Sequence, residues 1–388
     1  MIKWIASAGL LAGWFFGHPS GVFEITGGQF AGTATLDYPA IYVPFAPFFH
    51  AADHLTILSV HQHMALLAFL NLLWILRRPR ILKSLQFNLA YAAFLAATIL
   101  IPRPMARLEV KDPDILIYNA HSHTSHSWDA HKAFTPEKNL LWHKQAGFHA
   151  SFVTDHNVIS GSQAAQAIFE RDHNGAIPLS GEELSLQNCH LAILGNTTLI
   201  PNGPYESNME GIQKFMAVMK SSRALVIASL PEYWKYHWER KENFIEWGVG
   251  GFEIANATPF ALDFPPAQRK AIIDLCRKNR LAMMGVTDQH GWGYTCYVWN
   301  TARIPNWRSL NRPQIEDALL THLKKDGDQA NQVFVRIKAE PQDNKLWLAV
   351  DPLLQFWEMA RTLPAAHVLS FLFWLWVPNR ILRRWKTR

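Results

Sequence analysis

The chain has 388 residues, a formal net charge of +6, and a composition that is 49% hydrophobic but only 18% charged. This composition excludes a disordered or collagen-like chain. Two short basic segments, 77–83 and 379–388, carry nine positive charges and no acid, so the rest of the chain sums to −3. A nucleic-acid-binding protein spreads its basic residues over a folded face, so we expect no nucleic acid as a partner. Three widely spaced cysteines argue against a disulfide framework or a thiolate zinc finger: Cys189, Cys276 and Cys296.

Long uncharged apolar runs lie near both ends of the chain and predict helices that span a membrane. A bilayer core is crossed by about 20 apolar residues in a helix, with a range of roughly 17–25. The first run follows Lys3 and could be a signal segment, but no clear cleavage site follows Phe16, so we expect an anchor. The sequence thus predicts an N-terminal membrane region, 1–111, and a C-terminal anchor with a basic tail, 352–388. The four predicted spans are 4–23, 55–76, 84–102 and 362–378.

The two basic segments also predict the orientation of the chain, because loops rich in Lys and Arg stay in the cytoplasm. Segments 77–83 and 379–388 give the same result, with residues 103–361 outside and the C-terminus inside. We therefore expect a multi-pass protein of the bacterial inner membrane with a periplasmic domain. Residues 38–52 are apolar but contain three prolines, so they predict an interfacial or re-entrant segment.

Between the membrane regions, residues 112–351 alternate short apolar strands with amphipathic helices. Repeated βα units predict an α/β fold whose parallel sheet is either open or closed into a barrel. Active sites in such folds lie at the carboxyl ends of the strands. One helix begins after Thr135-Pro136-Glu137, a typical N-cap followed by Pro, and ends before Gly147. The other expected helices are 162–171, 209–220 and 267–278, and the expected strands are 115–119, 150–154, 191–194, 224–229, 252–255 and 282–286.

Five of the predicted strand ends carry His, Asp or Glu residues. In an extended segment His121 and His123 point to one face, so their imidazoles can chelate one cation. Carboxylates from other strands can bridge that cation to a second, and a mixed His and carboxylate set suits zinc, manganese or iron rather than calcium. The sequence has neither a P-loop nor a G-x-S-x-G elbow, so Ser180 and Ser185 are weak candidates for a nucleophile. The candidate residues are His121, His123, Asp129, Asp155, His156, Glu182, Glu183, His190, Asp288 and His290.

The order of these residues resembles the polymerase and histidinol phosphatase (PHP) family. The motifs are H-x-H-T-x-x-S-x-D, T-D-H, G-x-E, a single His and D-x-H, within residues 118–292. The resemblance implies a distorted (β/α)7 barrel flanked here by transmembrane helices, a site for up to three divalent metal ions, and hydrolysis of phosphoesters. By position, it implies a first metal on His121, His123, Glu183 and Asp288, a second on Glu183 and His190, and a third on Asp129, His156 and His290.

The chain departs from the family pattern at one position. The family has a His before Pro at the end of a middle strand, as a ligand of the second metal, whereas Leu230 precedes Pro231 here. The second metal could then be more open, could use Glu232 or another residue, or could be held weakly. The adjacent Glu182 also leaves the choice of bridging carboxylate open. Glu253, in a segment resembling another family strand, could be a site residue or a structural one.

These features predict a metal-dependent phosphoesterase. Bridging metals would lower the pKa of a shared water, and Asp155 would orient a ligand or that water. The leaving group could take its proton from His290, His190 or water. We expect a phosphorylated lipid or another cell-envelope phosphoester as substrate, because the domain is tethered at both ends. The alternatives are soluble periplasmic phosphoesters and a non-catalytic, metal-dependent sensor or scaffold; the sequence does not predict the oligomeric state.

Overall fold

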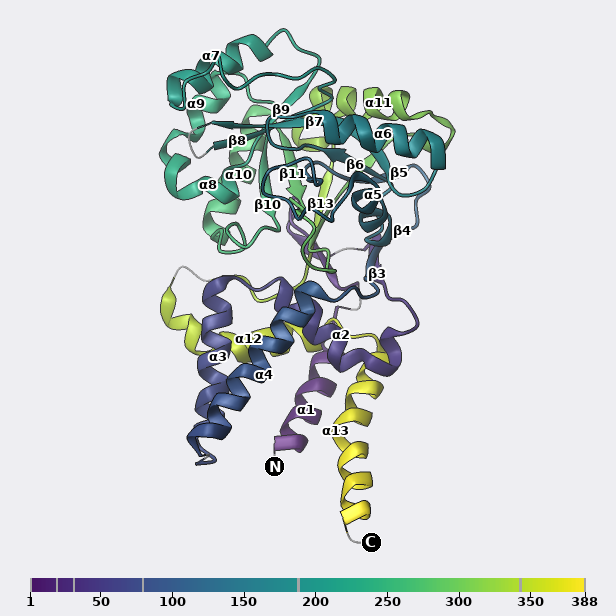
Figure 1. The fold of residues 1–388 in the computed structure, drawn as a ribbon, viewed down its shortest axis with the longest axis vertical. Helices are drawn as coiled ribbons and strands as arrows, with labels where there is room; N and C mark the ends of the chain where they lie inside the picture. The colour runs from purple at the N-terminus through teal and green to yellow at the C-terminus, as the bar shows by residue number, and fades with distance from the viewer. Residues whose placement is uncertain are drawn as a thin grey trace.

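The chain forms an α/β domain and a helical module that lies beneath it in the view of Figure 1. The computed structural model describes residues 2–18, 20–30, 32–78, 80–186, 189–341 and 344–386. Helices from both ends of the chain build the module, with α2 packed on α13 and α4, and α1 packed on α12 and α13. Its helices are α1 (Ile2–Phe15), α2 (Tyr42–Thr56), α3 (Val60–Ile75), α4 (Ile81–Leu100), α12 (Asp351–Ala360) and α13 (Ala365–Lys386).

The α/β domain is built on a mixed sheet of eleven strands in the order β11-β10-β9-β8-β7-β6-β5-β12-β13-β1-β2. Neighbours are parallel within β5–β6–β7 and within β9–β10–β11, whereas β8 and β12 run antiparallel to both their neighbours. The strands are β1 (Val22–Glu24), β2 (Gln29–Phe30), β5 (Ile115–Asn119), β6 (Ala150–Val153), β7 (Ile177–Leu186), β8 (Cys189–Leu194), β9 (Leu225–Ala228), β10 (Gly251–Asn256), β11 (Ala282–Val286), β12 (Val298–Arg303) and β13 (Gln332–Arg336). A separate pair, β3 (Ala34–Asp37) and β4 (Arg107–Val110), joins the domain to the module.

The central strands of the sheet are buried on both faces, which explains why they read as continuous apolar runs. Strands β6, β9, β10 and β11 are buried along their whole length. As predicted, α5 starts at Pro136 after Thr135, whose side chain accepts a hydrogen bond from the Lys138 amide. In Figure 1, α7–α10 gather on one side of the domain, and α5, α6 and α11 on the other. These helices are α5 (Pro136–Gln145), α6 (Ser160–Asp172), α7 (Met209–Met219), α8 (Leu230–His237), α9 (Lys241–Glu246), α10 (Pro266–Asn279) and α11 (Arg312–Asp326).

The sheet curls so that β11 returns beside β5 at the carboxyl ends of both strands. A parallel bridge joins Ser122 to Gln289, and the Asp288 amide donates to the His121 carbonyl at 3.0 Å. Buried Asn300 of β12 accepts from the Gly285 amide and donates to the carbonyl of Tyr118. The fold is therefore mixed α/β with a curled sheet, which fits the predicted barrel, but its antiparallel strands β8 and β12 were not predicted as such.

The structure does not support the predicted spans. Among the described residues, no helix is both long enough and apolar enough to cross a membrane. Run 4–23 yields the 14-residue helix α1, because the chain leaves the helix after Phe15 and enters β1. Run 55–76 is divided, because α2 ends at Thr56 and Ser59 then forms a capping box with Gln62 that starts the 16-residue α3.

The other two runs and the proline-rich segment also form helices. Run 84–102 lies in the 20-residue α4, whose sequence includes Lys83, Gln86 and Asn88. Run 362–378 begins after the end of α12 and lies mostly in α13, and the side chains of the predicted basic tail fall outside the described residues. The proline-rich segment 38–52 forms most of α2, which contains Pro47 and a kink at Phe45.

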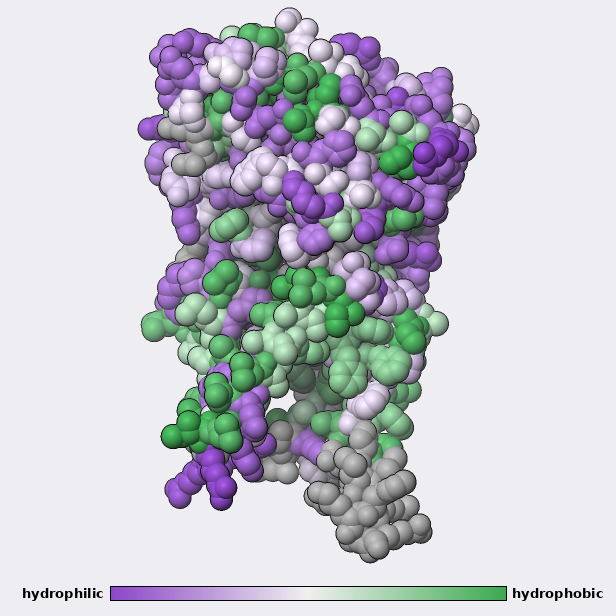
Figure 2. Space-filling view, viewed as in Figure 1, coloured by the Kyte–Doolittle hydropathy of each residue, from purple (hydrophilic) through white to green (hydrophobic). Residues whose placement is uncertain are grey.

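Hydrophobic side chains gather over the helical module, whereas the α/β domain is mostly hydrophilic (Figure 2). Large apolar residues are exposed on all six helices of the module, for example Phe15 of α1 at 77% and Ile81 of α4 at 91%, and Leu76 just after α3 is 71% exposed. Below this region, exposed basic residues lie in the turn between α3 and α4 and in the first turn of α4: Arg77, Arg78, Arg80 and Lys83.

Candidate metal centre

The predicted ligands meet at the carboxyl ends of the parallel strands. His121 and His123 follow β5, His156 follows β6, Glu183 lies in β7, His190 lies in β8, and Asp288 and His290 follow β11. Within each of three overlapping groups, one ligand atom from every residue lies within 4.8 Å of the others. The groups are His121, His123 and Glu183; His156, Glu183 and His190; and His123, Asp129, His156 and His290.

Glu183 belongs to two of the three groups and is fully buried. Its Oε2 is 3.0 Å from His121 Nε2, 3.2 Å from His123 Nε2 and 3.1 Å from His156 Nδ1. Its Oε1 is 2.8 Å from His190 Nδ1. One carboxylate therefore faces four imidazoles, which is the position expected of a bridging ligand.

Glu182 points to the opposite face of β7, because successive side chains of a strand alternate. Its Oε2 accepts hydrogen bonds from Asn196 Nδ2 at 2.8 Å and from the Ile200 amide at 3.0 Å. Burial raises the pKa of Glu182 to about 7. The structure thus brings Glu183, and not Glu182, to the candidate centre.

Asp288 closes one side of the centre. Its Oδ1 lies 2.9 Å from His123 Nε2 and 3.5 Å from His121 Nε2. Asp288 has a φ of +44°, which is uncommon for a residue other than glycine and is often found at functional sites. The hydrogen bond from its amide to the His121 carbonyl helps to hold this backbone in place.

Asp129 and His290 form the accessible side of the centre. Asp129 Oδ2 lies 3.1 Å from both His156 Nε2 and His290 Nε2, and Ser127 Oγ donates to its other oxygen at 2.7 Å. The Asp129 and His290 side chains are 24% and 21% exposed, whereas those of His121 and His123 are fully buried. The centre is therefore open to solvent on the side of Asp129 and His290.

Buried polar residues hold the candidate ligands in position. Glu253 of β10 contacts His121 Nδ1 at 2.8 Å and accepts from Ser229 Oγ at 2.6 Å. Asn256 Nδ2 lies 3.0 Å from Glu253 Oε2 and 3.1 Å from Asp288 Oδ2. Sequence reasoning named Glu253 but missed Ser229 and Asn256, although Asn256 ends a strand that leads to the site.

Asp155 has a different place from the ligands. It is buried, and its carboxylate accepts from the Thr124 amide at 2.6 Å and from Thr124 Oγ1 at 2.7 Å. It therefore fixes the loop that carries His123 and Asp129, and it belongs to none of the three groups. Asp155 was predicted to orient a ligand or a water. In the structure it hydrogen-bonds Thr124, in the loop that carries the candidate ligands.

The charges of the site favour a cation. Burial alone would lower the pKa of His123, but Asp288 and Glu183 outweigh it and raise this pKa to about 9. Burial likewise opposes protonation of His190, and Glu183 raises its pKa to about 10. Burial would raise the pKa of Glu183 itself, but the surrounding imidazoles hold it well below its ordinary value. The ionised carboxylates thus draw protons onto the imidazoles, and divalent cations would satisfy the same demand.

Atoms without hydrogen-bond partners also fit metal binding. Among the described residues, neither oxygen of Glu183 accepts a hydrogen bond of ordinary geometry, and His123 Nδ1 has no partner. Buried polar atoms without partners are rare and need an explanation. A mixed set of imidazoles and carboxylates is the donor set used for zinc, manganese and iron.

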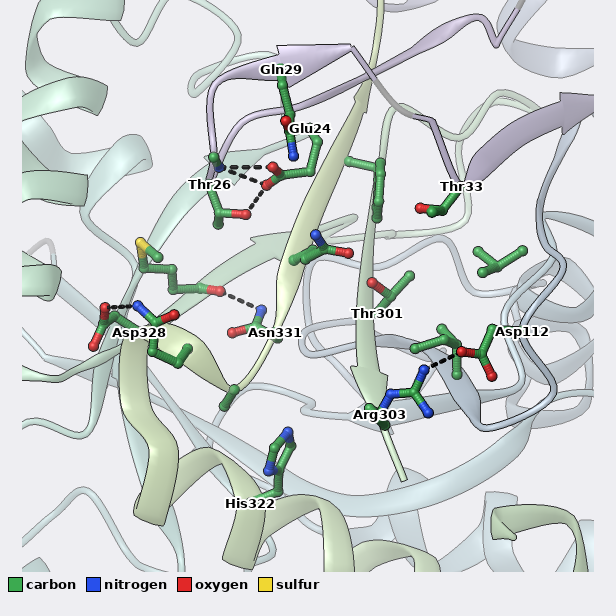
Figure 3. Close-up of a pocket in the computed structure, with 18 of the residues that line it drawn as sticks. Glu24, Thr26, Gln29, Thr33, Asp112, Thr301, Arg303, His322, Asp328 and Asn331 are labelled. Atoms are coloured by element: carbon green, nitrogen blue, oxygen red, sulfur yellow. Dashed lines mark hydrogen bonds and ion pairs between the residues drawn. The ribbon is translucent and has the colours of Figure 1, made fainter. Parts of the chain in front are cut away.

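A cavity of about 640 Å³ lies at the opposite, amino end of the parallel strands (Figure 3). Its charged side chains are already paired: Arg303 with Asp112, Arg277 with the Thr26 carbonyl, and Glu24 with Thr26. None of the candidate metal ligands lines it. The cavity is therefore separate from the candidate centre, and its polar groups indicate no particular ligand.

Comparisons with known proteins give only distant similarities. No family model and no curated protein matches the sequence. A protein of Bifidobacterium adolescentis described as a metal-dependent phosphoesterase is 16% identical, over 45% of this chain and 87% of its own, with a TM-score of 0.35. A two-domain Bacteroides vulgatus protein containing a PHP-like metal-dependent phosphoesterase is 15% identical, over 57% of this chain and 65% of its own, with a TM-score of 0.41. An amidohydrolase from Chromobacterium violaceum, with bound sulfate and no metal, is 14% identical over 52% of this chain and 96% of its own, with a TM-score of 0.33.

Proposed function

We propose that the chain is a metal-dependent hydrolase of phosphoesters. The observation that carries this proposal is the position of Glu183, whose two oxygens face four imidazoles supplied by different strands and loops. His121, His123, Glu183 and Asp288 would hold one cation, and Asp129, His156 and His290 would hold another at the accessible side. When bound, such cations supply a water of lowered pKa and positive charge beside the phosphate oxygens.

The residues of the chain account for the rest of the reaction. Asp129 and His290 lie where the substrate enters, and His290 Nδ1 lies 2.7 Å from the Asp288 carbonyl, so that Nδ1–H donates and Nε2 faces Asp129. With Nε2 on a cation and Nδ1–H held by the Asp288 carbonyl, His290 has no proton to give, and His190, which is 16% exposed, would also be a ligand. The leaving oxygen would therefore take its proton from water. Exposed Trp128 packs beside His156 and forms an apolar edge of the entrance.

The test compares two adjacent glutamates. Glu183→Gln removes the carboxylate at the centre, whereas Glu182→Gln makes the same change on a neighbouring buried residue that points away. We expect purified wild-type protein and Glu182→Gln to contain divalent metal and to hydrolyse members of a panel of phosphate monoesters and diesters. We expect Glu183→Gln to lose metal and turnover. Full turnover by the metal-free wild type, or by Glu183→Gln, would overturn the proposal.

We further propose that the helical module attaches the enzyme to the bacterial inner membrane, with the α/β domain in the periplasm. The exposed apolar side chains of the module, such as Phe15 and Leu76, support this location, as does the basic turn between α3 and α4. This orientation requires helices of the module to carry the chain across the bilayer, although no described helix is by itself long and apolar enough to cross it. A reporter active only in the cytoplasm should function when fused after Arg388 and fail when inserted at the exposed Gly203. The opposite pattern would overturn the orientation.

A membrane-borne phosphoester is the substrate that this arrangement favours. The carboxyl ends of β10 and β11 face the module, because Asp263 pairs with His61 of α3 at 2.7 Å and the Gly293 amide donates to the Ile99 carbonyl of α4 at 3.1 Å. The candidate centre thus opens at the end of the domain nearest the module. Beside it, Trp292 and Leu100 are 48% and 60% exposed and line a small cavity with Lys138.

The substrate proposal is tested by comparing kcat/KM for a lipid phosphate in vesicles with that for its water-soluble head-group ester. We expect the lipid to be preferred, because a tethered enzyme meets membrane-borne substrate at high effective concentration. A preference for the soluble ester would favour a phosphatase of soluble periplasmic phosphoesters. Metal binding without turnover of any ester would favour a sensor or scaffold.

A further inference from the structure

The family pattern has a histidine at the position of Leu230, and the acidic residue Glu232 lies two positions further along the chain. Leu230 is only 3% exposed and packs in the apolar core with residues of α7 and β10. Helix α8 begins at Leu230, and Glu232 lies in its first turn. Because residues two apart on a helix point in different directions, the helix that buries Leu230 turns Glu232 toward the candidate centre.

Glu232 reaches the same imidazole nitrogen as Glu183. Its Oε2 lies 3.5 Å from His190 Nδ1, and Glu183 Oε1 lies 2.8 Å from that nitrogen. The Glu232 side chain is 13% exposed, and among the described residues its Oε2 accepts no hydrogen bond of ordinary geometry. His190 Nδ1 therefore lies between two carboxylates, one of which lacks a donor.

A single imidazole proton cannot satisfy this arrangement. The Tyr233 hydroxyl lies 2.9 Å from His190 Nε2 and 3.3 Å from Nδ1, and the two rings are in edge-to-face contact. If only Nε2 is protonated, the Nδ1 lone pair faces two negative carboxylates. If Nδ1 is protonated, in the neutral ring or in the imidazolium, its single hydrogen pairs well with at most one of the two carboxylates. Leaving a buried carboxylate without a partner costs free energy, and a divalent cation between the three groups removes that cost.

We propose that Glu232 is a ligand of the second cation, together with His190 and Glu183. It would take the role of the histidine that the family pattern has at the position of Leu230. This inference rests on the proposed metal centre. The second site then has two carboxylates and one imidazole. Carboxylate oxygen suits manganese, whereas imidazole suits zinc well, so the site shifts its preference toward manganese relative to a site with one more histidine.

Metal binding by the full-length protein tests this assignment without reference to turnover. Wild-type, Glu232→Gln, Glu232→His and Glu239→Gln proteins are stripped of metal and titrated with Mn²⁺ and with Zn²⁺. Glu239 is exposed on the segment that follows α8, so Glu239→Gln is a matched loss of one negative charge. Metal content is counted after desalting.

We expect Glu232→Gln to lose one Mn²⁺ per chain, or to bind it at least about tenfold more weakly, and Glu239→Gln to match the wild type. We expect Glu232→His to regain the full count, with a relative preference moved toward Zn²⁺, which also shows that the variants fold. Wild-type stoichiometry and affinity in Glu232→Gln would overturn the assignment of Glu232. A wild-type protein that binds no metal would instead overturn the proposed function itself.

Discussion

Asp53 of α2 joins the helical module to the loop that carries Asp288 and His290, and its replacement by Asn should destabilise both. Asp53 is 1% exposed. Its Oδ1 accepts from Arg103 at 2.9 Å and from Thr295 Oγ1 at 3.0 Å, and its Oδ2 accepts from Arg336 at 2.8 Å. Thr295 lies on the loop between β11 and β12, so one buried carboxylate links the module, that loop and β13.

The expected loss of folding free energy in Asp53→Asn follows from the burial of Arg103 and Arg336. The Arg103 and Arg336 side chains are 7% and 8% exposed, so Asn leaves two nearly buried guanidinium groups without their counter-charge. Removing one partner of a buried ion pair costs about 3–5 kcal/mol. The matched control is Asp37→Asn, which breaks the pair with Arg107 where both side chains are 40% or more exposed. An exposed pair contributes only about 0–1 kcal/mol.

Denaturant unfolding of the full-length protein, followed by tryptophan fluorescence, measures the difference. Hydrogen exchange of the amides in 289–297 measures the local effect on the loop. We expect Asp53→Asn to lower the unfolding midpoint and to speed exchange in the loop, and Asp37→Asn to change neither appreciably. Equal effects of the two substitutions would refute the reasoning that the buried network holds the metal-ligand loop.

The contribution of Asp53 to folding stability should decrease as the pH falls. Burial would raise the pKa of Asp53, but Arg336 and Arg103 outweigh it and hold the pKa below 3.8. The folded protein therefore binds fewer protons than the unfolded chain near this pH. The stabilisation by Asp53 is complete above about pH 4 and is lost as the pH falls through the folded pKa. Wild-type protein should lose stability more steeply than Asp53→Asn below pH 4.

Three further predictions concern the metal centre and the core. Metal binding at pH 7 should release protons and strengthen from pH 6 to 8, since the pKa values of His123 and His190 are raised to about 9 and 10 in the metal-free protein; calorimetry in two buffers of different ionisation enthalpy measures the release, and none at pH 7 would contradict it. Glu253→Gln should weaken metal binding about 10–100-fold, because Glu253 holds His121 Nδ1, and a titration with Mn²⁺ checks it. Phe152→Ala should lower the free energy of unfolding by about 3–5 kcal/mol, because Phe152 is fully buried in β6; a loss below 1 kcal/mol would contradict the packing.

Local signals predicted several elements well. The strands 115–119 and 282–286 have their predicted bounds, and α5 begins where the Thr135-Pro136 signal placed it. These elements are specified by short apolar runs, caps and proline, all of which act within a few residues. Strands β12 and β13 escaped prediction because their role is set by antiparallel partners distant in the chain, such as β5.

The apolar runs near both ends of the chain show that composition alone does not predict where a helix begins and ends. An uncharged run of suitable length predicts a span, yet the run 55–76 is divided by the capping box of Ser59 and Gln62. Buried Gln62 also donates to Asp351 and to the Ala339 carbonyl, far along the chain. Tertiary partners of this kind fix where a helix starts, and hydropathy does not register them.

The sequence by itself determined which residue types stand at the strand ends, and so the metal chemistry that we propose. It did not determine which side chains meet, because that depends on how the sheet curls and on the side of each strand that faces the centre. Tertiary structure placed Glu183 among four imidazoles and Glu182 on the other face. It also buried Leu230 and turned Glu232 toward His190. The position at which α8 begins decides which of its side chains faces the centre, and a match to a sequence motif does not show this.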